Sequence, residues 1–207
     1  MLKILGRKNS SNVQKVIWLC DEIGLKFDRE DVGMQFGKNR EAPYLAMNPN
    51  GTVPTIVDDG FVLWESNAIL RYLSAKYGAG KAWPEDPQAR ALADQWMDWQ
   101  QTVLGPAYGP VFFNLVRAKP DQRDMKAVGP AVEKTAAALA MLDGRLAKSD
   151  FVAGKAFSAG DIPVGIVAYR WYNFEGIERP EMKNLKKWYE RLCERAPFRS
   201  NIMVGMT

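Results

Sequence analysis

The 207-residue chain contains no histidine. Histidine is the base of Ser-His-Asp and Cys-His catalytic sites and a frequent ligand of zinc and iron, so its absence excludes those sites. The sequence also lacks a CxxC pair and the glycine-rich loops GxGxxG and GxxxxGK[ST], which excludes dithiol redox chemistry and the common phosphate-binding loops. An enzyme built from this chain must rely on hydroxyls, amides, backbone groups or a thiol carried by its ligand. We expect no metal.

Cysteine is scarce. Cys20 and Cys193 are far apart, and each lies in an apolar helical pattern, which fits reduced, buried thiols in a cytoplasmic protein better than a disulfide. The apolar segment Met1–Gly6 is interrupted too soon, by Arg7 and Lys8, to be a signal peptide. No apolar run approaches the length of a membrane span. We therefore expect a cytoplasmic protein that does not enter a membrane.

An excess of one charge is also missing. The net charge is only +4, and the basic residues form no run, so we expect no nucleic-acid partner. Apolar residues make up 47% of the chain and include seven Trp and nine Phe, enough to bury a sizeable core.

The first eighty residues alternate between strand and helix patterns. Val13, Val16 and Cys20 recur at helical spacing, and Asp59-Gly60 separates two β runs as in a hairpin. The predicted elements are, in order, a strand at Leu2–Leu5, a helix ending at Gly24, a strand at Lys26–Val32, a short helix through Tyr44 and Leu45, strands at Thr55–Val57 and Phe61–Leu63, and a helix ending at Gly78. A strand, helix and strand followed by a hairpin predict a small mixed sheet with helices on both faces.

The remainder of the chain has only helical patterns. Three sets of apolar residues each share one helix face: Leu92, Trp96, Trp99 and Val103; Val132, Leu139, Leu142 and Leu146; and Met182, Leu185, Trp188 and Leu192. The Gly- and Pro-containing segment 79–87 predicts a linker. We therefore expect an α/β domain at 1–78 and an all-helical domain at 88–207.

Within the helical part, Ser158 and Asp161 have the spacing of a helix N-cap and an acidic N3 residue, with Phe157 and Ile162 placed as a hydrophobic staple. We expect Asp161 to have a structural role.

Two motifs in the α/β part resemble those of the soluble glutathione S-transferases. Asn48-Pro49-Asn50-Gly51-Thr52-Val53-Pro54 is similar to the NP-x-G-x-VP motif of that family, and Trp64-Glu65-Ser66-Asn67-Ala68-Ile69 is similar to its ES-x-AI motif. The resemblance covers essentially the whole chain. It implies a thioredoxin-like βαβαββα domain that binds glutathione as co-substrate, an all-helical domain that contributes the electrophile pocket, and a homodimer.

The loop Asn9–Asn12 falls where this family carries its thiol-activating residue. Ser10 aligns with the serine of theta-like and zeta-like members, and the absence of Tyr argues against the tyrosine-dependent classes, so the chain resembles a bacterial theta-like, serine-type member. Asn12 matches an asparagine used by some bacterial members. Ser10, Ser11 and Asn12 are all candidates for the catalytic residue, and any one of the three can instead cap the helix that follows.

Elementary energetics support a hydroxyl in this role. Lowering a thiol pKa by ~2 units needs about 2.7 kcal/mol of preference for the anion, and one hydrogen bond to a charged group contributes roughly 1.5–3 kcal/mol. A helix N-terminus adds about 0.3–1 kcal/mol. A serine at the start of a helix therefore suffices, and no histidine is required.

The two motifs also indicate how the rest of glutathione is held. The resemblance implies a cis Val53–Pro54 bond that directs the Val53 N–H and C=O outward to pair with the cysteinyl part, with Thr52 and Pro54 beside it; a trans proline opening a strand is the alternative. Glu65 and Ser66 precede a helix, where free N–H groups and the hydroxyl favour a carboxylate, although Ser66 alone would also be a helix cap.

Further site residues follow from the alignment with the family and from aromatic spacing. Asn39 and Arg40 align with positions that bind the glycine carboxylate, or are simply solvated. Tyr108, Phe112, Phe113 and Arg117 are candidates for the electrophile pocket, although an aromatic stripe at helical spacing is also typical of a core.

The resemblance implies an enzyme that conjugates the glutathione thiolate to electrophilic, largely apolar compounds, a detoxification reaction. A glutathione-dependent isomerase or reductase, such as a zeta-like maleylacetoacetate isomerase or a disulfide reductase, is an alternative that the Ser10-Ser11 pair favours. A non-catalytic glutathione-binding module is another, although Val53-Pro54 and Glu65-Ser66 are intact.

Overall fold

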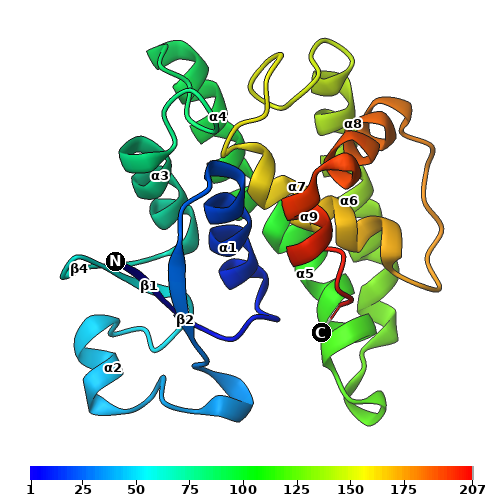
Figure 1. Cartoon of the computed structure of the whole chain (residues 1–207). Helices are drawn as coiled ribbons and strands as arrows, with labels where there is room; N and C mark the ends of the chain where they lie inside the picture. Colours follow the sequence, from blue (N-terminus) through cyan, green and yellow to red (C-terminus); the bar gives the residue numbers. More distant parts are fainter. Residues whose placement is uncertain (207) are drawn as a thin grey trace. The chain divides into compact units, whose positions relative to one another are not determined.

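The computed structural model of the chain describes residues 1–206, which divide into two compact units. The first runs from Met1 to Trp83, and the second begins at Pro84. The first contains a sheet with helices, and the second consists of helices and their connecting loops (Figure 1). The division falls inside the segment 79–87, for which the sequence predicts a linker.

The sheet of the first unit has four strands in the order β2-β1-β3-β4. They are β1 (Leu2–Leu5), β2 (Phe27–Glu30), β3 (Thr55–Asp58) and β4 (Phe61–Trp64). β1 and β2 are parallel, whereas β3 is antiparallel to both β1 and β4. Asp59 and Gly60 connect β3 to β4 with positive φ angles of 50° and 89°, as a two-residue hairpin turn requires. The predicted mixed sheet is confirmed.

Helices cover both faces of this sheet (Figure 1). α1 (Ser11–Ile23) and α3 (Ser66–Tyr77) pack against each other, and α1 ends at Gly24, whose φ of 73° suits glycine. α2 (Ala42–Met47) lies on the opposite face, where its Tyr44 packs against Leu5 of β1. A 3₁₀ turn at 34–36 precedes α2. The element order is the predicted βαβαββα of a thioredoxin-like domain.

The second unit is helical, as predicted. Its helices are α4 (Pro87–Trp99), α5 (Gly105–Phe112), α6 (Met125–Leu146), α7 (Asp161–Asn173), α8 (Lys183–Glu194) and α9 (Ala196–Asn201). A π turn at Gln100–Leu104 joins α4 to α5, and a second at Phe113–Arg117 extends α5, which gives one continuous helical stretch. A 3₁₀ turn follows at 120–122. Pro106 and Pro110 lie in this stretch, where each removes a backbone N–H donor from the helix ladder.

The predicted apolar faces differ in how fully they are buried. Leu185, Trp188 and Leu192 of α8 are buried, as is Met182, its N-cap residue. In contrast, Leu92 is 37% exposed and Val103 is 43% exposed. The core side of α4 instead carries Ala93, Trp96 and Met97.

Asp161 at the start of α7 is fully buried and ties together three segments of the helical unit. Its carboxylate accepts hydrogen bonds from the Val152 N–H at 3.0 Å, the Ser158 N–H at 2.9 Å, the Ser158 hydroxyl at 3.1 Å and the Trp188 indole N–H at 2.9 Å. Burial raises the pKa of Asp161 to about 6, while these four donors act in the opposite direction. The helix begins at Asp161 itself, so Ser158 lies before the N-cap position, which Gly160 occupies.

Two further features concern the described part of the chain as a whole. None of the helices in residues 1–206 combines the length and the apolar character needed to cross a membrane. The same residues contain no group of three or more His, Cys, Asp or Glu side chains placed to hold a metal ion.

Replacing Asp161 with Asn tests the structural role. Because an amide nitrogen would face buried N–H donors that now bind a carboxylate oxygen, we expect Asp161→Asn to lower the free energy of unfolding by about 2–3 kcal/mol in urea denaturation. Asp150→Asn is the matched control, since that exposed carboxylate pairs only with Arg191 at 2.7 Å and should contribute less than about 1 kcal/mol. Equal stability of the two variants would contradict the role assigned to Asp161.

Candidate active site

Ser10 occupies the N-cap position of α1. Its backbone has the extended conformation of a cap, with φ −80° and ψ 124°, yet its hydroxyl makes no capping hydrogen bond. Ser10 is 6% exposed, and its Oγ has no hydrogen-bond partner within residues 1–206. A cap serine ordinarily accepts a bond from the first turn of its helix. The hydroxyl at this position is therefore available to a ligand.

The next two residues differ from Ser10. Ser11 is half-buried as the first residue of α1, and Asn12 is exposed. The side-chain amide oxygen of Asn12 accepts a hydrogen bond of 3.3 Å from the Ser66 hydroxyl, which connects the start of α1 to the start of α3. Its amide nitrogen has no partner in the described chain. The Ser11 hydroxyl also has no hydrogen-bond partner in the described chain, so all three thiol-activating candidates retain an uncommitted donor beside α1.

Val53 lies next to the loop that leads from β1 to Ser10. A Cβ built on Gly6 would stand 3.2 Å from the Val53 Cβ, so glycine permits the close approach. The Val53–Pro54 bond is cis, which confirms the prediction. Neither the N–H nor the C=O of Val53 is hydrogen-bonded within residues 1–206. This residue presents an unpaired extended edge to a ligand.

The turn that precedes Val53 is held in place by hydrogen bonds from two side chains. The Thr52 carbonyl accepts hydrogen bonds from the Tyr44 hydroxyl at 2.6 Å and from the Asn48 amide at 2.9 Å. Both side chains also bond the Thr55 hydroxyl, at 2.8 Å and 3.1 Å. The Asn-Pro-Asn-Gly motif therefore has a physical role, because it holds the backbone at Val53 in one position.

Asn39 and Arg40 hold the same turn. The Asn39 amide donates to the Gly51 carbonyl at 2.7 Å, and an Arg40 guanidinium nitrogen donates to the Asn50 carbonyl at 3.2 Å. Arg40 is otherwise exposed. Both residues lie beside the turn that leads to Val53, and both keep N–H groups that can donate hydrogen bonds to a carboxylate.

The start of α3 carries a hydroxyl beside a buried ammonium group. Lys15 of α1 is 6% exposed, and its Nζ lies 3.4 Å from the Ser66 hydroxyl and 3.2 Å from the Asn67 side-chain oxygen. A positive charge and a helix N-terminus both favour an anion. This end of α3 is therefore suited to a carboxylate.

Glu65, the N-cap residue of α3, has a backbone conformation that is unusual for a side chain with a Cβ. Its φ is 71° and its ψ is 110°. Such conformations cost on the order of 1–3 kcal/mol and persist where the surroundings impose them, often at functional sites. The carboxylate is exposed and has no hydrogen-bond or ion-pair partner in the described residues. It is available to a ligand ammonium group.

In the helical unit, three of the four predicted pocket residues lie together. The Tyr108 and Phe112 rings are 6.2 Å apart, and the Arg117 guanidinium carbon lies 5.3 Å from the Phe112 ring centre. Phe113 is 55% exposed and is absent from these contacts. Arg170 of α7 joins the three, with its guanidinium carbon 3.9 Å from the Phe112 ring centre and a 3.2 Å hydrogen bond to the Tyr108 hydroxyl.

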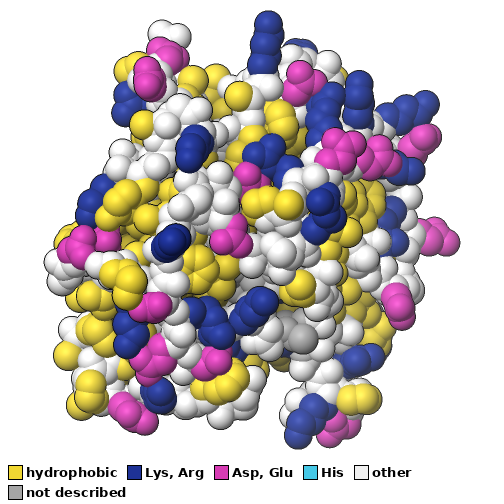
Figure 2. Space-filling view, viewed as in Figure 1, with side chains coloured by type: hydrophobic (Ala, Val, Ile, Leu, Met, Phe, Trp, Pro, Cys, Tyr) yellow, Lys and Arg dark blue, Asp and Glu magenta, His cyan; other side chains and the backbone are white. Residues whose placement is uncertain are grey.

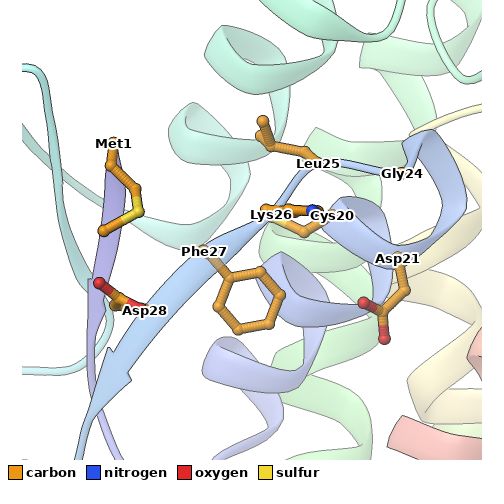
Figure 3. A pocket seen from close by; sticks show the side chains of 8 residues that line it. All are labelled: Met1, Cys20, Asp21, Gly24, Leu25, Lys26, Phe27 and Asp28. Carbon is orange, nitrogen blue, oxygen red and sulfur yellow. The ribbon is translucent and has the colours of Figure 1, made fainter.

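Neither cysteine is suited to act as a nucleophile. Cys20 is fully buried in α1, and burial raises the pKa of its thiol to about 12. Burial also raises the pKa of the Cys193 thiol. Cys20 borders a hollow that is lined by Met1, the end of α1, the following loop and the start of β2 (Figure 3). None of the predicted site residues lines this hollow.

Lys15 and Arg170 were not among the site residues predicted from the sequence. Each had a signal. Lys15 directly precedes Val16 on the apolar face of α1, and Arg170 interrupts the run Ile162–Trp171, every residue of which is buried. Elsewhere, Lys and Arg side chains are interspersed with Asp and Glu over the face shown in Figure 2.

Comparisons with known proteins agree with these observations. The model of the glutathione S-transferase N-terminal domain matches residues 9–76, and that of the C-terminal domain matches residues 98–196. Glutathione S-transferase GstB of Escherichia coli K12 is 40% identical over the full length of both chains.

Solved structures give the same result. A theta-class glutathione S-transferase from Xanthomonas axonopodis pv. citri, with glutathione bound, is 40% identical with a TM-score of 0.94, and the match covers 100% of this chain and 99% of that one. Glutathione transferase F7 of Populus trichocarpa is 25% identical with a TM-score of 0.87, over 100% of both chains. The chain therefore belongs to the glutathione S-transferase family.

Proposed function

We propose that this glutathione S-transferase conjugates glutathione to electrophilic, largely apolar compounds and that Ser10 activates the thiol. The observation that carries the assignment is the Ser10 hydroxyl, which occupies a helix N-cap without capping the helix. The hydroxyl donates a hydrogen bond to the sulfur, the thiol proton leaves to solvent, and the thiolate attacks the electrophile. Ser11 and Asn12 are the alternative donors, since the Ser11 hydroxyl and the Asn12 amide nitrogen are also uncommitted within residues 1–206.

The remaining parts of glutathione bind to residues of the first unit. The γ-glutamyl carboxylate binds at the start of α3, where Ser66 and Lys15 supply a hydroxyl and a positive charge. Its ammonium group pairs with the exposed Glu65 carboxylate. The cysteinyl backbone pairs with the unbonded Val53 N–H and C=O, between Thr52 and Pro54.

The glycine carboxylate binds Asn39 and Arg40, whose side chains already reach the turn beside Val53. The electrophile binds in the helical unit at Tyr108, Phe112 and Arg117. Phe113 lies outside the contacts that join these three, and we leave it at the margin of the pocket.

The enzyme acts as a homodimer in the cytoplasm, where it removes toxic electrophiles. Both cysteines are free thiols, as suits a reducing compartment. Phe61 on β4 is 48% exposed, and its ring lies 5.0 Å from that of Tyr72 on α3, tilted by 45°. In the second unit, Leu92 of α4 and Val103 of the following π turn are also exposed. Exposed apolar side chains on each unit support an interface between copies.

Removing the Ser10 hydroxyl tests the thiol activation. With Ser10→Ala we expect the pKa of bound glutathione to rise by about 1–2 units, because the lost hydrogen bond favoured the anion. Ultraviolet absorbance of the thiolate during a pH titration measures this pKa, and calorimetry confirms that glutathione still binds.

The other two loop variants are the controls. Ser11→Ala and Asn12→Ala should keep the thiolate absorbance near neutral pH. If the absorbance survives in Ser10→Ala and disappears in Asn12→Ala, then Asn12 is the activating residue. If the wild type binds glutathione without any thiolate, the protein is a binding module.

Removing the buried ammonium group tests the carboxylate site. Lys15→Met should weaken glutathione binding by about tenfold or more, since a hydrogen bond to a charged group is lost. Lys26→Met removes one exposed charge from the same unit and should leave the affinity unchanged. Calorimetric titration of both variants measures the difference, and equal affinities would show that Lys15 does not serve the ligand.

The homodimer has its own test. Sedimentation equilibrium of the wild type should give about twice the 23.3 kDa chain mass. Phe61→Asp should shift the population toward monomer, because it places a charge in the proposed interface. Met141→Asp changes another exposed apolar side chain, on α6, and should have no effect on the mass. A monomeric wild type would refute the assignment.

A further inference from the structure

Arg170 is a buried cation without a carboxylate partner. It is 3% exposed, and within residues 1–206 no Asp or Glu lies at ion-pair distance from its guanidinium. Its side chain meets the Tyr108 hydroxyl at 3.2 Å and the face of the Phe112 ring at 3.9 Å. Burial of a charge is costly unless an opposite charge compensates it.

A second arginine shares the same ring. Arg117, at the end of the α5 stretch, lies 5.3 Å from the Phe112 ring centre. Burial, and then the positive charge of Arg170, lower the pKa of Arg117. Arginine nevertheless stays ionised in proteins, so two positive charges face one aromatic ring. Like charges held together in a protein repel each other and favour an anion between or beside them.

Other arginines of this unit show how a structural arginine is satisfied. Arg145 donates to the Val152 carbonyl at 2.9 Å, and Arg179 donates to the carbonyls of Trp171, Phe174 and Ile177. Arg191 pairs with Asp150 at 2.7 Å. Each of these guanidiniums has a backbone carbonyl or a carboxylate. The Arg170 guanidinium binds neither a backbone carbonyl nor a carboxylate. A cation–π contact of about 0.5–2 kcal/mol does not explain why two arginines gather at Phe112.

We propose that Arg117 and Arg170 bind an anionic group on the electrophile, so that the preferred second substrates are aromatic compounds carrying a carboxylate or a similar monoanion. The planar guanidinium forks suit a carboxylate, the Tyr108 hydroxyl lies beside Arg170, and the Phe112 ring packs against the aromatic part of the substrate. This rests on the proposed transferase function, in which the electrophile is the second substrate.

Two substrates of equal shape and different charge test the preference. 4-(Bromomethyl)benzoate and 4-(bromomethyl)benzamide both react at the benzylic carbon, where the C–S bond to glutathione forms as the C–Br bond breaks and bromide leaves with the bonding pair. We expect the ratio of kcat/KM for the benzoate to kcat/KM for the benzamide to exceed the ratio of their uncatalysed rates by about tenfold. Equal ratios with and without enzyme would overturn the proposal.

Substitution of Arg117, which is half-buried, then tests whether the preference for the benzoate arises at the two arginines. Arg117→Gln should lower the preference for the benzoate by about tenfold, chiefly through KM, while Arg117→Lys should retain part of it because it keeps the charge and loses the fork. Arg191→Gln removes one charge from a guanidinium that already binds a carboxylate and should retain the full preference. A preference unchanged in Arg117→Gln and Arg170→Gln would also overturn the proposal.

A binding measurement separates this inference from the transferase function. Calorimetry with the unreactive 4-methylbenzoate and 4-methylbenzamide, in the presence of saturating glutathione, requires no turnover. Tighter binding of the benzoate by a protein without transferase activity would uphold the arginine site and refute the proposed function. Transferase activity with equal binding of the two compounds would uphold the function and refute the arginine site.

Discussion

In the proposed reaction, everything depends on one hydrogen bond from a protein hydroxyl to a sulfur anion that the protein does not itself supply. A chain without histidine has no ordinary side-chain base near neutral pH, and burial, complete for Cys20 and partial for Cys193, raises the pKa of both of its own thiols. Stabilising the anion of a ligand thiol removes the need for a base. About 2.7 kcal/mol is enough for a shift of ~2 pKa units, and a single charged hydrogen bond is of that size.

The fold of the first unit serves this purpose by fixing three backbone positions. The end of β1 leads through Gly6 to Ser10 at the start of α1, the Asn48–Thr52 turn holds Val53, and Glu65 with its unusual φ begins α3. Ser10 and Glu65 are N-cap residues and Val53 lies in the loop before β3, positions at which backbone groups are left unpaired and can bind a peptide ligand. The regular elements provide rigidity, and in the proposed complex the ligand completes their hydrogen bonds.

The sequence predicts most of this architecture because the signals are local. Alternation and the Asp59-Gly60 turn predict the hairpin, and helical spacing predicts α1 and α8. The face of α4 is less well predicted. Leu92 is exposed because the core side of α4 runs through Ala93, Trp96 and Met97, and Val103 lies in the π turn Gln100–Leu104, which changes the helical repeat. Ser10, Val53 and Ser66 follow from motifs. Lys15 and Arg170 do not, because the burial of a charge is decided by residues distant in sequence.

The most direct test of the central claim is a crystal structure of the protein with glutathione bound. The account predicts that the glutathione sulfur lies within hydrogen-bonding distance of the Ser10 hydroxyl, with the cysteinyl backbone paired to Val53. A sulfur remote from Ser10, or a peptide that does not pair with Val53, would contradict it.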